Sequence, residues 1–180
     1  TTLPYRELLS GDAPHKSLLK KKSSRGGRNA FGRITTRHQG GGHKRRLRDI
    51  DFRYDKKNIP AKIETVEYDP FRSAFIGLAL YRDGERRYVI LPKGVKVGDS
   101  FIVGENAPLT QGNRLPLGSI PVGTFVYNIE LSPGAGAALV RSAGNFAEVV
   151  AHDAGYAQVK LPSTEIRKIS DLAWASIGAV

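Results

Sequence analysis

The side chains whose types and spacing most clearly suggest a function are the cations of residues 16–48. This segment holds 12 Lys or Arg and no Asp or Glu, with six glycines among them. Arginine binds phosphate in bidentate fashion, and lysine supplies a point charge. Glycine lets a backbone come close to a phosphate. The pattern therefore predicts a segment that binds a polyanion, for which nucleic acid is the best fit.

Nine residues of this segment are the candidate RNA contacts. They are Arg25, Arg28, Arg33, Arg37, His38, His43, Lys44, Arg45 and Arg46. Phe31 and His38 are expected to stack on unpaired bases. The alternative is a solvated basic tail kept for solubility, but solubility favours charges of both signs. The segment has only five large apolar residues, so we expect an extended arm that orders against its partner.

Two further candidates lie in a neutral part of the chain. Residues 1–60 hold 16 basic and 5 acidic side chains, whereas residues 61–180 hold 12 of each. Arg72 follows the Asp69–Pro70 turn, and Arg141 follows a run of small residues. We expect both to stand apart from carboxylate partners. The small residues before Arg141 would let an RNA backbone lie close to the loop.

Catalytic and metal patterns are weak. The chain has no cysteine, which excludes disulfides, thiol nucleophiles and thiolate metal sites. His38 and His43 lie among cations, which would repel a metal ion. No nucleotide P-loop and no nucleophile elbow is present. We predict no enzyme, no cofactor and no metal. The enzyme alternative is a hydrolase that uses Ser142, or a metal held by His38 and His43.

No apolar run approaches the ~18 to 20 residues that span a bilayer. No charged and then apolar leader opens the chain, so the sequence predicts neither a secretory signal nor a membrane partner.

The elements that must position these residues are short β-strands separated by turns. They are expected at residues 61–68, 75–81, 86–91, 100–103, 124–131, 147–151, 155–161 and 164–169. The strongest hairpin signal covers residues 75–91. Short strands at this spacing predict an all-β protein. A short helix is expected only around residues 170–176. Residues 106–121 are expected to form a boundary between two small barrels, with one continuous sandwich as the alternative that the length allows.

Five motifs resemble the family of large-subunit ribosomal protein L-two, in its bacterial or organellar form. They are GGRNAFGRITTRHQGGGHKRR (26–46), IETVEYDPFRSA (63–74), YRDGERRYVILPKG (81–94), LPLGSIPVGT (115–124) and VRSAGN (140–145). The similarity runs in collinear order from about residue 22 to residue 180.

The resemblance implies an extended basic N-terminal arm (1–46), an oligonucleotide-binding-type barrel (47–114) and an SH3-like barrel (115–180). It implies a primary rRNA-binding constituent of the large ribosomal subunit that supports subunit association and the peptidyl transferase region. The implied partners are large-subunit rRNA, neighbouring ribosomal proteins and the small subunit at the intersubunit bridge. The implied location is the ribosome, in a bacterial cytoplasm or an organelle matrix or stroma. Arg72 and Arg141 match arginines that contact rRNA in the family.

The sequence departs from the family at three places, one of which is Leu172-Ala173-Trp174, where relatives commonly have a cysteine. The family usually reads Gly-Lys-Gly-Gly where this chain has Gly134-Ala135-Gly136-Ala137, which removes one cation. Family members also continue past the position that matches Val180 into a basic Gly/His-rich region, and the resemblance implies no role of that region for residues 1–180. The alternative function is a general single-strand RNA-binding protein or RNA chaperone, which would use aromatic stacking platforms.

Overall fold

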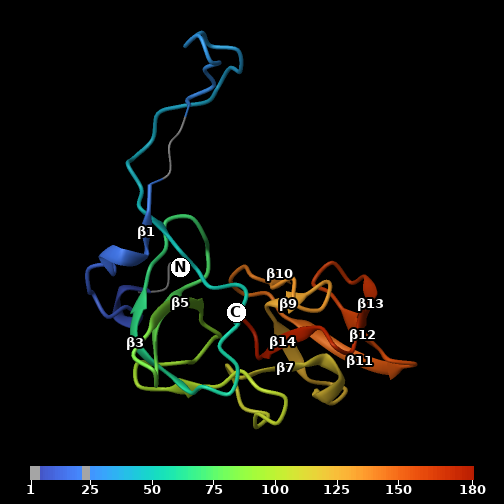
Figure 1. The fold of residues 1–180 in the computed structure, drawn as a ribbon. Helices are drawn as coiled ribbons and strands as arrows, with labels where there is room; N and C mark the ends of the chain where they lie inside the picture. Colours follow the sequence, from blue (N-terminus) through green and yellow to red (C-terminus); the bar gives the residue numbers. More distant parts are fainter. Residues whose placement is uncertain (1–4, 22–24) are drawn as a thin grey trace.

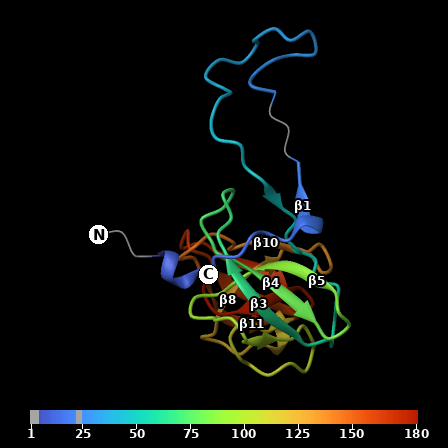
Figure 2. The same cartoon turned by 90° about the vertical axis from the view of Figure 1, so that its left-hand side faces the viewer.

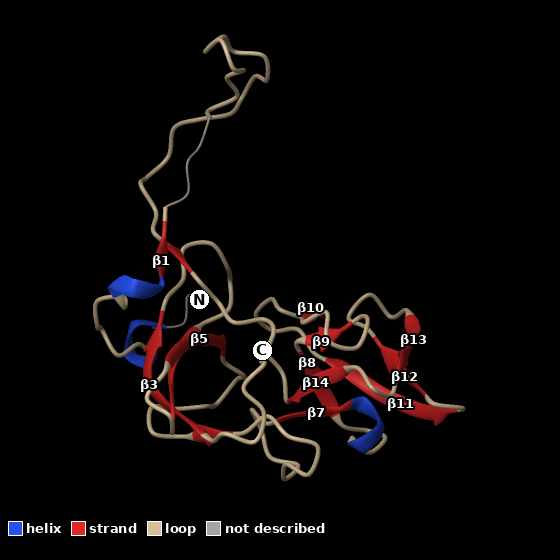
Figure 3. Ribbon diagram, viewed as in Figure 1, coloured by secondary structure: helices blue, strands red, loops and turns tan. Residues whose placement is uncertain are grey.

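The computed structural model describes residues 5–21 and 25–180. A β-rich body carries a long arm that extends away from it (Figure 1; Figure 2). Strands and loops make up nearly all of the body, with three short 3₁₀ helices at Tyr5–Leu8 (η1), Lys16–Leu18 (η2) and Leu117–Ser119 (η3) (Figure 3). The prediction of an all-β protein is confirmed. Nowhere in the described ranges does the chain form a helix with the length and hydropathy needed to cross a bilayer.

The first sheet has the strand order β5-β4-β3-β6, with antiparallel pairing throughout. Its strands are β3 (Ala61–Glu67), β4 (Ile76–Tyr81), β5 (Arg86–Ile90) and β6 (Ser100–Phe101). The β4–β5 turn contains Gly84 at φ +88°, a conformation that glycine adopts at little cost. The hairpin predicted over residues 75–91 is confirmed.

The second sheet has the order β13-β12-β11-β8-β14-β7, also antiparallel. Its strands are β7 (Arg114–Pro116), β8 (Phe125–Tyr127), β11 (Ala147–Asp153), β12 (Tyr156–Lys160), β13 (Ile166–Ser170) and β14 (Trp174–Ile177). A separate pair joins β9 (Ile129–Glu130) to β10 (Ala137–Leu139). Residues 106–121, which the sequence predicts as a boundary, contain the strand β7, and Leu115 of this strand is buried.

The short helix predicted around residues 170–176 is wrong. The chain forms the end of β13 and most of β14 there. All four residues of β14 are buried, and the strand pairs with β7 on one side and β8 on the other. A short apolar run has the same appearance in a central strand and in a buried helix, so periodicity could not separate the two.

The cores of the two sheets are continuous. Tyr54 and Phe101 of the first half pack in one cluster with Trp174 of the second. Ile76 and Tyr88 pack in another with Val180, the last residue. In Figure 1 the C-terminus accordingly lies between the two sheets. The body thus gives loops from both sheets fixed positions relative to each other.

The first described segment is tied to the first sheet. The Ser10 N–H donates to the Val66 carbonyl at 3.0 Å, and the His15 N–H donates to the Tyr88 hydroxyl at 2.8 Å. Tyr88 donates in turn to the buried Glu67 carboxylate at 2.9 Å. Burial raises the pKa of Tyr88 to about 12. This hydroxyl therefore stays protonated, and can donate to Glu67, throughout the physiological pH range.

The arm leaves the body through two paired strands, β1 (Leu19–Lys20) and β2 (Leu47–Arg48). Beyond them it folds back on itself through short-range hydrogen bonds. The Gly27 carbonyl accepts from the Thr35 and Thr36 N–H groups, and the Asn29 side chain accepts from the Phe31 and Arg33 N–H groups. No residue between 25 and 46 is buried. The arm is ordered by its turns and has no core of its own.

Candidate nucleic-acid interface

Two of the predicted arginines meet over one aromatic ring. Phe52 follows β2, and its ring is partly buried against two core clusters. The Arg72 Cζ lies 5.6 Å from the ring centroid, and the Arg141 Cζ lies 4.7 Å from it. Arg72 belongs to the β3–β4 connection and Arg141 follows β10, so each half of the body supplies one guanidinium.

A buried carboxylate holds Arg72. The Arg72 Nε donates to the Asp69 Oδ2 at 2.6 Å, and Asp69 is fully buried. The other Asp69 oxygen accepts from the Phe71 N–H at 2.9 Å, which fixes the turn. The expectation that Arg72 would lack a carboxylate partner is wrong. The reason is the tight turn after Asp69, which brings a residue three positions later back onto the aspartate side chain.

Asp69 holds Arg72 through Nε alone. Neither terminal nitrogen has a hydrogen-bond partner among residues 5–21 and 25–180, and the side chain is 20% exposed. Asp69 therefore orients the guanidinium, and its two remaining nitrogens can bind an anion.

The loop that carries Arg141 rests on the backbone of Phe52. The Ala137 N–H donates to the Phe52 carbonyl at 2.7 Å. A Cβ added at Gly136, where φ is +86°, would lie 2.9 Å from the same carbonyl oxygen. Residue 136 must therefore lack a side chain because the backbone of Phe52 passes close to it. Gly134 and Ala135 remain exposed, where a ligand can come close.

A further hydrogen bond joins the two arginine loops directly. The Ala143 N–H donates to the Ser73 hydroxyl at 3.2 Å, one residue beyond Arg72. The Arg141 guanidinium also donates to the Ala137 carbonyl at 3.4 Å, and its side chain is otherwise exposed.

Arg45 reaches the same turn from the base of the arm. Its guanidinium lies 4.7 Å from the centroid of the Phe71 ring and donates to the Pro70 carbonyl at 3.2 Å. We call Arg45, Arg72 and Arg141, with the rings of Phe52 and Phe71, the arginine cluster. Three guanidiniums held on one surface form an arrangement suited to phosphate oxygens.

The other candidates lie along the arm and are not brought to the arginine cluster. They are Arg25, Arg28, Arg33, Arg37, His38, His43, Lys44 and Arg46, all exposed. Phe31 is 89% exposed at the far part of the arm. Figure 2 shows this blue-to-cyan segment standing clear of the body. The arm thus presents its cations to solvent, where a polyanion can reach them.

A buried ion pair lies beneath the Arg141 loop. The Arg114 Nη2 donates to the Glu130 Oε1 at 3.0 Å, and both side chains are almost wholly buried. The other Glu130 oxygen accepts from the Gly134 N–H at 3.0 Å. Arg114 also packs over the Tyr54 ring at 4.6 Å, and burial raises the pKa of Tyr54 to about 12. This network fixes the start of the loop that ends at Arg141.

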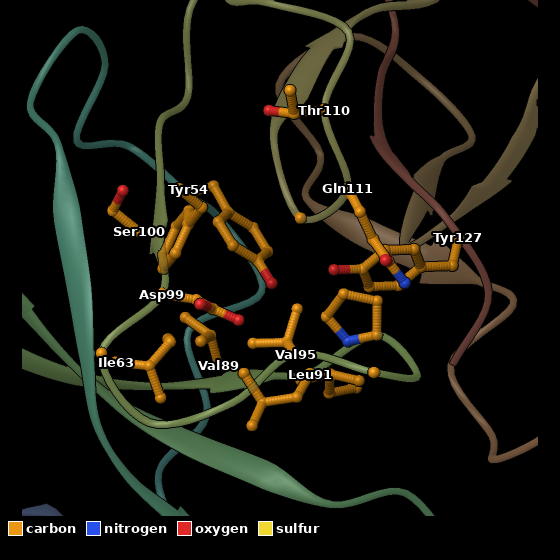
Figure 4. Close-up of a pocket in the computed structure, with 16 residues that line it drawn as sticks. Tyr54, Ile63, Val89, Leu91, Val95, Asp99, Ser100, Thr110, Gln111 and Tyr127 are labelled. Carbon is orange, nitrogen blue, oxygen red and sulfur yellow. The ribbon is translucent and has the colours of Figure 1, made fainter.

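A cavity of about 480 Å³ lies where the two halves meet (Figure 4). Tyr54, Leu91 and Tyr127 contribute to its walls, and Asp99 is the only charged residue among the described residues that line it. The Asp99 carboxylate already accepts from the Lys96 N–H at 2.8 Å. The cavity has no cation to offer a phosphate. Within the described ranges, no group of three or more His, Cys, Asp or Glu residues could hold a metal ion.

Sequence reasoning missed Phe52 and the network beneath the Arg141 loop. A usable signal for Phe52 was present, because Ile50, Phe52 and Tyr54 alternate with charged residues, a pattern that predicts one shared apolar face. Arg114 lies in the stretch interpreted as a boundary, where a buried ion pair was not expected. The Asp69–Arg72 spacing did carry a usable signal, because an aspartate that opens a turn is often within reach of the third residue after it.

An all-β body with ordered surface arginines, joined to an exposed cationic arm, is the class of protein that binds nucleic acid through its phosphates. The comparisons with known proteins agree. Residues 15–103 match the family described as "Ribosomal Proteins L2, RNA binding N-terminal domain", and residues 110–180 match "Ribosomal Proteins L2, C-terminal domain". The chain belongs to the ribosomal protein L2 family.

Similar relatives include the "Large ribosomal subunit protein uL2" of three strains of Buchnera aphidicola subsp. Acyrthosiphon pisum (Tuc7, 5A and APS). Each is 54% identical over 174 residues, which cover 97% of this chain. The chain spans 63% of the length of these relatives.

Proposed function

We propose that the chain is a structural, rRNA-binding constituent of the large ribosomal subunit. The observation that carries this proposal is the arginine cluster, in which both halves of the body place a guanidinium on Phe52. Membership of the L2 family supplies the identity of the RNA. The description of the N-terminal family match as RNA binding supports the same conclusion.

The mechanism divides the work between arm and body. The arm lies along rRNA and neutralises phosphates, which releases counterions and makes affinity fall with salt. The arginine cluster binds phosphates at fixed positions, so that the body docks on one folded shape of RNA. The proposed contacts are Arg25, Arg28, Arg33, Arg37, His38, His43, Lys44, Arg45, Arg46, Arg72 and Arg141.

The proposed domain division is an arm (1–46), an oligonucleotide-binding-type barrel (47–114) and an SH3-like barrel (115–180). The strand content of each part supports it, because the first sheet lies within residues 61–101 and the second within residues 114–177, so that β7 starts one residue before the proposed boundary.

The remaining proposals follow from the family. The chain is placed on the ribosome, in a bacterial cytoplasm, with the organelle matrix or stroma as the alternative. It contacts neighbouring ribosomal proteins and the small subunit at the intersubunit bridge, and it supports the peptidyl transferase region. It has no catalytic activity, cofactor or membrane partner.

Binding to large-subunit rRNA tests the proposal. We expect Arg72→Gln and Arg141→Gln each to weaken binding at least about tenfold, because a hydrogen bond to a charged group contributes ~1.5–3 kcal/mol. Matched controls are Arg82→Gln in the β4–β5 turn and Arg167→Gln on β13, both exposed, which should bind like the parent. Thermal melts should be unchanged for Arg141→Gln and for both controls. Arg72→Gln leaves the buried Asp69 without its cation and should melt at a lower temperature, so its binding is measured well below that temperature.

Three outcomes would count against the proposal. Failure of the chain to sediment with large subunits at moderate salt would contradict the assigned location. A flat salt response would contradict phosphate binding. Equal affinity for unrelated RNA would favour a general single-strand binder or RNA chaperone instead.

A further inference from the structure

A groove runs along the second half of the body, starting at Arg141. One wall is the loop over residues 138–146, and the other is the turn over residues 161–164. The part next to Arg141 encloses about 340 Å³, and the part next to β8 encloses about 490 Å³. Asn145, Leu161 and Pro162 line both parts, so the two are continuous. We call this the lateral groove.

The far end of the lateral groove carries two exposed aromatic rings. Phe125 is 47% exposed and Phe146 is 43% exposed. Their ring centroids are 4.5 Å apart at an interplanar angle of 52°. Burying both rings would be favourable in water, so an exposed aromatic pair in a groove marks a place where a partner binds.

The polar groups of the groove are unused. The Asn145 amide and the hydroxyls of Ser142, Ser163 and Thr164 have no hydrogen-bond partner within the described part of the chain. Amides and hydroxyls of this kind can bond to the edge of a nucleobase or to a ribose hydroxyl.

Both walls of the groove are held in place. The Val180 N–H donates to the Asn145 carbonyl at 3.0 Å, and the Thr164 N–H donates to the Leu161 carbonyl at 2.9 Å. Each wall also contains a β-branched residue with left-handed backbone, Val140 at φ +55° and Thr164 at φ +70°. Such conformations are costly for β-branched residues and occur mainly where function requires them.

The charges favour RNA as the occupant. Arg141 stands at one end and the exposed Lys160 at the other, with Glu148 as the one carboxylate among the described lining residues. Glu148 is partly buried and lies opposite Lys160 in the strand register. A polyanion matches two exposed cations better than an apolar peptide does. The groove also continues directly from the arginine cluster, so a strand bound there could enter it.

We infer that the lateral groove binds one or two unpaired nucleotides of the RNA, with a base stacked on the Phe125–Phe146 pair and phosphates at Arg141 and Lys160. This inference rests on the proposed function and adds a site that recognises unpaired bases. Sequence-tolerant stacking on aromatic rings contributes ~1–3 kcal/mol per base. That magnitude corresponds to at least about fivefold in affinity.

The test uses the full chain and a transcript of bacterial large-subunit rRNA. The double variant Phe125→Leu, Phe146→Leu keeps apolar side chains but removes both rings, and we expect a loss of fivefold or more. Phe146→Tyr, which keeps the ring, should bind within twofold of the parent. Tyr156→Leu is the matched control, because Tyr156 is 50% exposed on β12 and does not line the groove. It should also bind within twofold.

Chemical probing of the RNA supplies the second measurement. We expect one or two bases that the parent chain protects to become reactive with the double variant, while protection elsewhere persists. Unchanged affinity and protection for the double variant, alongside weakened Arg72→Gln and Arg141→Gln variants, would overturn this inference and leave the proposed function intact.

A further result would reassign the occupant. Weaker sedimentation with assembled subunits, without any change in affinity for naked rRNA, would indicate a protein occupant and overturn the inference as well. If no variant and no parent chain bound rRNA, the proposed function itself would fail.

Discussion

The cations of the arm and those of the body are held in opposite ways. On the arm, Arg37 and Lys44 are exposed and make no ion pair among the described residues. In the body, Arg72, Arg87 and Arg114 each contact at least one carboxylate, at 2.6, 2.6 and 3.0 Å for the partners Asp69, Glu85 and Glu130. The same side chain therefore serves as free charge in one region and as part of the architecture in the other.

This difference decides what each region can recognise. An exposed arm that lacks a core loses conformational freedom when it binds, so its contribution depends on charge density and is sensitive to salt. The body has already ordered its arginines on folding, so it can select RNA by the positions of phosphates. Charge alone therefore locates the partner, while the fixed positions of Arg72 and Arg141 supply shape selectivity.

The largest expected effect is on the free energy of unfolding, and it tests whether the cations of the body, unlike those of the arm, stabilise the fold. Arg114→Met leaves Glu130 buried without its cation, which should lower the free energy of unfolding by about 3–5 kcal/mol. Arg37→Met on the arm is the control and should change it by less than about 0.5 kcal/mol. Urea denaturation of both variants measures the difference.

Adding Glu130→Gln to Arg114→Met should recover part of the loss, since it removes the unpaired charge. Equal stability for the Arg114 and Arg37 variants would show that the body does not depend on this ion pair.

The second effect is on RNA affinity. Lys20 and Leu47 are paired across β1 and β2, so an Asn-Gly turn can replace residues 21–46 and close the hairpin. The replacement removes nine Lys or Arg. We expect about 100-fold weaker rRNA binding in low salt and a log–log salt slope that is smaller by several units.

The same variant tests the independence of the body. Its thermal melt should match that of the parent, because none of the described residues of the replaced segment (21 and 25–46) is buried. The variant also lacks Arg45 of the arginine cluster, but Arg72 and Arg141 remain, so selectivity for large-subunit rRNA over unrelated RNA should persist. If selectivity vanished with the arm, the assignment of shape recognition to the body would be wrong.

The sequence predicted the parts of the fold that local chemistry decides. Strands bounded by turn residues, such as β4 and β5 around Gly84, were located within one residue of their bounds. The predicted strand over residues 124–131 is divided into β8 and β9 by Asn128, which adopts φ +50°. β14 was missed because its partners β7 and β8 are distant in sequence, and only tertiary pairing makes it a strand.

The candidate site likewise has features that local sequence predicts and features that depend on tertiary packing. The arm candidates and the two body arginines follow from composition, turns and family resemblance. Their meeting on Phe52 depends on how the two halves pack, which no local pattern encodes. The Asp69–Arg72 ion pair lies between these cases, since the spacing is local but the burial of Asp69 is a tertiary property.

The smallest expected effect on rRNA affinity comes from changing Phe52, the ring over which Arg72 and Arg141 lie. Phe52→Leu keeps an apolar side chain beside the core but removes the ring over which both guanidiniums lie. A cation–π contact at a partly exposed site contributes ~0.5–1 kcal/mol, so two such contacts correspond to roughly fivefold to thirtyfold in rRNA affinity. Phe52→Tyr keeps the ring and should restore binding to within twofold.

A double-mutant cycle tests whether Phe52 affects rRNA binding by positioning Arg141. If Phe52 positions Arg141, then Arg141→Gln should have a smaller effect in the Phe52→Leu background than in the parent. The salt slope should be that of the parent apart from the Arg141 contribution, because the arm is untouched. Additive effects of the two substitutions would mean that Arg141 acts without Phe52. The arginines of the body would then resemble those of the arm more closely than their contacts suggest.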